Sequence, residues 1–129
     1  MIRRLIWAFV AFYLLTGLYI AVLPHDFYLN APGAQATGPY NMHFLRDVGF
    51  AFITSAAAIG YGVYANAKPV MVFGSLWLLM HGLFHLTLWA VHGAHLDGAA
   101  AIDAVTVSIP AVAIFALCMR YRAEPDVGI

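Results

Sequence analysis

Histidine is the residue type with the most evident chemistry in this chain. Four of the six histidines, His81, His85, His92 and His95, fall within the apolar residues 70–96. At about 100° of rotation per residue, one helix through this stretch places all four on a stripe roughly 80° wide. Lipid cannot satisfy imidazole groups, so the stripe must face protein, water or a ligand. The spacing therefore predicts a functional site on this segment.

The residue types of the site favour a metal ion. His81 and His85 are four residues apart, so one helix face can present both to a single ion, with Thr54 or water completing the coordination. A second, outer metal site is predicted from His43, Asp47, His92, His95 and Asp103. Imidazole and carboxylate ligands without thiolate favour zinc, copper(II) or non-haem iron.

Three other interpretations of the same residues stay open. The histidines could form a hydrogen-bonded polar network with buried water, which would set the helix register without any ion. Asp47 could orient a histidine instead of binding a metal itself. Haem is a weaker alternative, because its two axial histidines normally come from facing helices and only His25 or His43 could oppose the stripe in one chain.

Membrane-spanning helices are the elements expected to position these side chains. The chain has 129 residues, of which 64% are hydrophobic and 9% charged, and its mean hydropathy is +0.84. This composition predicts an all-α integral membrane four-helix bundle, a single transmembrane domain covering residues 1–129. The predicted spans are residues 5–23, 44–64, 70–92 and 100–119, and residues 24–43 form an outer loop. The basic, apolar N-terminus lacks a clear cleavage site and is interpreted as a retained first span.

Composition also excludes several classes of function. No basic run exists that would suit nucleic acid. The single cysteine, Cys118, rules out an internal disulfide and a thiolate cluster made by one chain. No nucleophile elbow, P-loop or dinucleotide-binding turn is present.

Basic residues predict the orientation of the spans. Arg3, Arg4, Lys68, Arg120 and Arg122 fall on one side of the predicted membrane, and only Arg46 falls on the other. The positive-inside rule then places both termini in the cytoplasm. The outer loop and the histidine cluster would face the periplasm, across the inner membrane of a bacterium.

The second predicted span carries a polar stripe that is expected to lie at the same height in the membrane as the histidines. His43, Asp47 and Thr54 share one face of a helix, and antiparallel neighbours joined by a short turn would put Thr54 opposite His81 and His85. The same counting puts His43 and Asp103 near His92. Arg46 is expected instead to anchor carbonyls of the outer loop or an anionic lipid headgroup.

Local signals predict how the elements begin, bend and pack. Asn41 is a candidate N-cap for the second span. Ala56 with Gly60, and Ala58 with Gly62, have the spacing of close helix contacts. Pro110 should kink the last span unless its neighbours satisfy the freed carbonyl. The outer loop is predicted to form a lid of turns over the site.

Residues 32–52, PGAQATGPYNMHFLRDVGFAF, carry a family resemblance. The pattern PG, TGP, N, HF, RD and G resembles one in small bacterial four-helix membrane proteins. Asn41, Arg46, Asp47 and Gly49, at the start of an apolar helix, are also loosely similar to DoxX-like proteins. The resemblance implies a four-helix membrane bundle of about this size, and it transfers no catalytic residues.

Three classes of function are compatible with these residues. The first is a metal-dependent membrane enzyme that activates water or oxygen towards a small or lipid-like substrate. The second is a non-catalytic accessory subunit, either in a homo-oligomer or in a larger respiratory or oxidase-type membrane complex. The third is a proton-relay or transport element whose histidines titrate near neutral pH.

Overall fold

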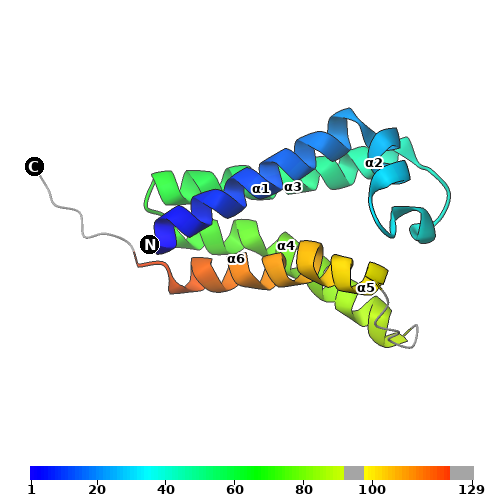
Figure 1. The fold of residues 1–129 in the computed structure, drawn as a ribbon. Helices are drawn as coiled ribbons and strands as arrows, with labels where there is room; N and C mark the ends of the chain where they lie inside the picture. Colours follow the sequence, from blue (N-terminus) through cyan, green and yellow to red (C-terminus); the bar gives the residue numbers. More distant parts are fainter. Residues whose placement is uncertain (92–97, 123–129) are drawn as a thin grey trace, which may run out of the picture.

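The chain is all-helical in the computed structural model, which describes residues 1–91 and 98–122; no strand occurs among these residues. Figure 1 shows the long helices lying side by side. The elements are α1 (Ile2–Val22), α2 (Pro24–Asn30), the 3₁₀ turn η1 (Ala34–Thr37), α3 (Met42–Tyr64), α4 (Lys68–Val91), α5 (Gly98–Asp103), the π-helical segment η2 (Ala104–Ser108) and α6 (Ile109–Arg120). The prediction of an all-α fold is confirmed.

Three of the helices are long and apolar enough to cross a membrane. Within the described residues they are Ile2–Val22, Lys68–Leu88 and Ala101–Arg120, the last running from within α5 through η2 to the end of α6. Helix α3 has 23 residues but is not among them, since Arg46, Asp47 and three glycines lower its hydropathy. Neighbours pack in the order α1, α3, α4 and α6, with a smaller contact between α1 and α6.

Glycines allow a close contact between the backbones of α1 and α3. A Cβ atom on Gly17 would lie 2.7 Å from the carbonyl oxygen of Gly49, and a Cβ atom on Gly49 would lie 2.8 Å from the amide nitrogen of Ala21. The predicted small residues also lie at helix contacts, with Ala58 beside Gly74 of α4 and Gly60 beside the Trp7 side chain. Removing side chains here lets the backbones approach as membrane helices commonly do.

Pro110 is accommodated by a wider helical turn. The amide of Ile109 donates to the carbonyl of Ala104, five residues earlier, which defines the π-helical segment η2. Proline has no N–H to donate and its ring crowds the carbonyl four residues earlier, so a regular α-turn cannot be completed at this position. The Ser108 hydroxyl donates to the Gly82 carbonyl at 3.1 Å and ties this segment to α4.

The predicted outer loop contains more regular structure than a series of turns. Pro24 begins α2, as proline's fixed φ and missing N–H allow. The Asp26 carboxylate accepts from the Tyr19 hydroxyl and from the Asn30 amide, which joins α2 to the end of α1. The Tyr28 hydroxyl donates to the Gly38 carbonyl at 2.9 Å. Helix α2 packs on α1 and α3.

One local prediction about the start of α3 is confirmed, and the expected partner of Arg46 is corrected from a carbonyl of the outer loop to one in α1. The Asn41 side chain accepts from the backbone amide of Phe44 at 3.1 Å and caps the helix. The Arg46 guanidinium donates through Nε to the carbonyl of Ala21 at 3.3 Å, so this cation anchors the last turn of α1.

Replacing Tyr121 by phenylalanine tests how the end of α6 is held. The buried Tyr121 donates its hydroxyl to the side-chain oxygen of Asn66 at 3.1 Å, which links α6 to the turn between α3 and α4. Tyr121→Phe is expected to lower the free energy of unfolding in micelles by about 1 kcal/mol. Tyr64→Phe, at a side chain 80% exposed, is the control and should have no effect. Equal losses in both variants would contradict the role of this bond.

Candidate functional site

An imidazole–carboxylate pair joins α4 to the end of α5. The His85 Nδ1 atom lies 2.8 Å from one carboxylate oxygen of Asp103 and 2.9 Å from the other. The side chains are 24% and 20% exposed, so both are largely shielded. A carboxylate at Nδ1 holds the proton on that nitrogen, and Nε2 then keeps its lone pair for a metal ion or a proton.

His81 lies one turn before His85 and contacts it directly. The two ring centroids are 4.7 Å apart, with 65° between the ring planes. The Trp77 indole stacks on His81 at 5.0 Å and 10°, and the edge of the Phe52 ring meets it at 5.5 Å and 87°. Two aromatic walls therefore orient the His81 ring, so that the pair of imidazoles sits in a defined arrangement.

Tyr13 extends this aromatic cluster to α1. Its ring stacks on Phe52 at 5.8 Å and 14°, and the side chain is only 3% exposed. Among the described residues its buried hydroxyl makes no hydrogen bond. The sequence does not place Tyr13 beside the histidines, because a tyrosine within an apolar helix gives no signal for the neighbour that its ring contacts.

The structure brings together His81, His85 and Asp103, and it separates two other predicted ligands from them. His43 and Asp47 pair with each other at 2.9 Å, and their side chains are 87% and 61% exposed. The expectation that His43 and Asp47 lie on an inward-facing stripe of α3 is therefore corrected. The remaining predicted ligands, His92 and His95, lie outside the described residues, as does the expected proximity of His92 to His43 and Asp103.

Thr54 also differs from its predicted place, because α3 is rotated about its axis. Thr54 is exposed, and it is Phe52 that contacts His81. The buried residues of α3 include Leu45, Gly49, Phe52, Ala56, Ile59 and Val63. The tight contact of Gly49 with α1 fixes this face inwards, and the stripe of His43, Asp47 and Thr54 is left on the outer face.

The distance between the two imidazole rings can be compared with that of two histidines bound to one ion. Two imidazoles bound at about 2.0 Å to one tetrahedral ion have ring centres roughly 5 Å apart, and those of His81 and His85 are 4.7 Å apart. Within residues 1–91 and 98–122, no three His, Cys, Asp or Glu side chains form a group that could hold a metal. The described residues thus supply two possible ligands and one orienting carboxylate.

Comparison with protein-family models, curated proteins and solved structures found no match for this chain. Its function therefore has to be inferred from the site itself.

Proposed function

We propose that this protein is a multi-pass membrane protein that binds a transition-metal ion through His81 and His85, with Asp103 orienting His85. The observation that carries the proposal is the 2.8 Å contact between Asp103 and His85 Nδ1, next to a second imidazole at 4.7 Å. Metal-binding histidines commonly give their second nitrogen to a carboxylate, which fixes the ring and raises its basicity.

The donor set favours zinc, copper(II) or iron, as expected for imidazole without thiolate. Water, a substrate atom or the predicted ligands His92 and His95 would complete the coordination. When bound, such an ion would act as a Lewis acid towards water or a small substrate. Asp103 would hold the His85 ring in place, and Trp77 and Phe52 would restrict the access of water to His81.

Four spans fit the arrangement of the helices best. The start of α1 and the end of α6 lie at the same end of the bundle, where Arg3, Arg120 and Arg122 line one pocket. Two chain ends on the same side of a membrane require an even number of spans. Because α3 packs between α1 and α4, it is the candidate for the fourth span. The arginines support a cytoplasmic assignment for this end. The histidine end would then face the periplasm across the inner membrane.

The test compares two carboxylates that contact histidines in the same way. Purified protein should bind zinc in a fixed molar ratio to the polypeptide. Asp103→Asn should weaken zinc binding about 10- to 100-fold. Asp47→Asn is the matched control, because Asp47 also contacts a histidine at 2.9 Å but is 61% exposed. Zinc titration with elemental analysis measures both effects. Folded protein that binds no metal, or equal effects in the two variants, would overturn the proposal.

A proton relay is the second candidate, and the contiguous groups Asp103, His85 and His81 favour it. Each contacts the next, and the carboxylate and His85 are partly exposed, so a proton could pass between them and water. Proteoliposomes separate the two functions: proton flux that is lost in His85→Gln, in protein free of metal, would support the relay over the metal site.

A further inference from the structure

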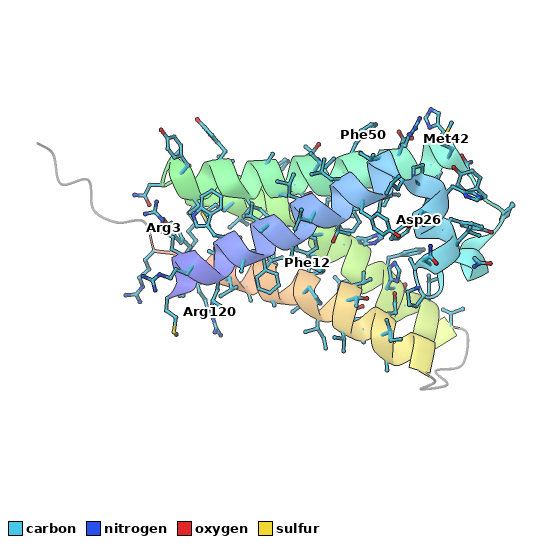
Figure 2. All side chains as sticks on the ribbon, turned by 45° about the horizontal axis from the view of Figure 1, so that its top comes forward. Arg3, Phe12, Asp26, Met42, Phe50 and Arg120 are labelled. Atoms are coloured by element: carbon cyan, nitrogen blue, oxygen red, sulfur yellow. The ribbon has the colours of Figure 1, made fainter. Side chains whose placement is uncertain are left out.

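Three arginines meet at the end of the bundle opposite the histidines. A pocket of about 460 Å³ is lined by Arg3 from the first turn of α1, Arg120 at the end of α6 and Arg122 just beyond it, together with Met1, Ile2 and Tyr121. Figure 2 shows Arg3 and Arg120 at this end and Asp26 at the other. The two ends of the chain therefore combine to form one basic pocket.

The positive charge of this pocket is not balanced by the described acidic residues. The ion pairs found among the described residues are His43 with Asp47 and His85 with Asp103. The third described carboxylate, Asp26, accepts hydrogen bonds from Tyr19 and Asn30. All three carboxylates are engaged far from the arginines. Guanidinium groups that line one pocket, with no carboxylate of the described residues beside them, repel one another, so an anion in the pocket would be stabilised.

The groups that line the pocket match the chemistry of a phosphate. Each guanidinium is planar, always charged and able to donate two parallel hydrogen bonds to phosphate oxygens. Met1, the N-cap of α1, forms no side-chain capping bond, and the amides of Arg4 and Leu5 donate to its carbonyl. The amides of Ile2 and Arg3, which precede the first intrahelical bond of this 21-residue helix, remain as donors at the same end. Arg3 itself lies at the positive end of the helix dipole, which adds to the attraction for an anion.

We propose that this pocket binds the phosphate of an anionic phospholipid headgroup. A lipid fits better than free phosphate because α1 and the α5–α6 segment are both candidate spans, and their ends coincide with the headgroup layer. Met1 is 97% exposed and supplies an apolar edge beside the arginines. Tyr121, buried and bonded to Asn66, forms a fixed wall.

The experiment measures lipid binding by native mass spectrometry of the detergent-solubilised full chain. Phosphatidylglycerol, phosphatidylcholine and inorganic phosphate are titrated separately. Arg3→Gln with Arg120→Gln should weaken phosphatidylglycerol binding about 25-fold, or about fivefold per arginine. The matched control is Arg4→Gln with Lys68→Gln, which removes two cations near the same end from outside the pocket lining. It should change the affinity less than about twofold.

The remaining outcomes decide the proposal. Equal weakening in the two double variants would show a general surface-charge effect and overturn the site. Equal binding of phosphatidylcholine, or displacement of the lipid by millimolar inorganic phosphate, would overturn the anionic lipid as its ligand. Arg122→Gln, beyond the end of α6, removes a pocket arginine without touching a helix. If the double variant fails to fold, a fivefold loss in Arg122→Gln supports the proposal and no loss overturns it.

Discussion

His85→Ala is expected to abolish specific metal binding. The substitution removes one of the two imidazoles that we propose as ligands, and it also removes the partner of Asp103. The loss should exceed the about 10- to 100-fold effect of losing an orienting carboxylate, because a ligand atom itself is gone. His81→Ala should have an effect of the same size. Zinc titration of the purified variants, followed by elemental analysis, measures both.

His43→Ala is the matched control for this prediction. Like His85, His43 contacts a carboxylate through its Nδ1 atom, but the His43 side chain is 87% exposed on the outer face of α3. Its replacement should leave zinc binding unchanged, and equal loss in His43→Ala and His85→Ala would mean nonspecific binding at the surface. His85→Ala leaves the shielded Asp103 carboxylate without its partner, which could itself destabilise the fold. The double variant His85→Ala with Asp103→Ala removes that carboxylate, so a loss of zinc binding in this variant cannot be caused by the unpaired charge.

Gly49→Ala is expected to lower the free energy of unfolding by about 1–3 kcal/mol, as overpacking does in tight cores. The added methyl group would lie 2.8 Å from the amide nitrogen of Ala21 and 2.9 Å from the carbonyl oxygen of Gly17. Both are backbone atoms, so the contact can be relieved only by moving α1 away from α3. Reversible unfolding in mixed micelles measures the loss.

Gly60→Ala is the control on the same helix. There the added methyl group would meet side-chain atoms of Trp7 at 3.3 Å and Val10 at 3.4 Å, which can shift without moving a helix. Alanine also favours the helix over glycine by about 1 kcal/mol. The free energy of unfolding should therefore change by less than about 1 kcal/mol. A loss as large as that of Gly49→Ala would contradict backbone contact as the cause.

The π-helical segment and the start of α5 explain why Asp103 contacts His85, a contact that the sequence did not predict. The span was expected to begin at residue 100, with Asp103 near His92. Helix α5 begins at Gly98, and five residues at 1.5 Å each carry Asp103 about 7.5 Å down the bundle, close to the height of His85. The wider turn before Pro110 then sets the direction of Asp103, which regular helical counting from α6 does not anticipate.

Local chemistry determined much of this protein from the sequence alone. Hydropathy and length predicted the long helices, the Asn41 side chain predicted the start of α3, and the spacing of His81 and His85 put their imidazoles side by side on one helix. Each of these depends on residues within one or two turns of each other. Backbone hydrogen bonding and helical periodicity act over that range.

The tertiary structure alone decided which side chains share the site. A polar stripe suggested that His43, Asp47 and Thr54 face inwards, but the close contact of Gly17 with Gly49 turned α3 so that Phe52 meets His81. Rotation of a helix about its axis depends on the fit of small residues against another helix, far away in sequence. Near the start of α3, exposed polar side chains can contact lipid headgroups or water as well as protein. Their polarity therefore did not determine which face of α3 turns towards the other helices.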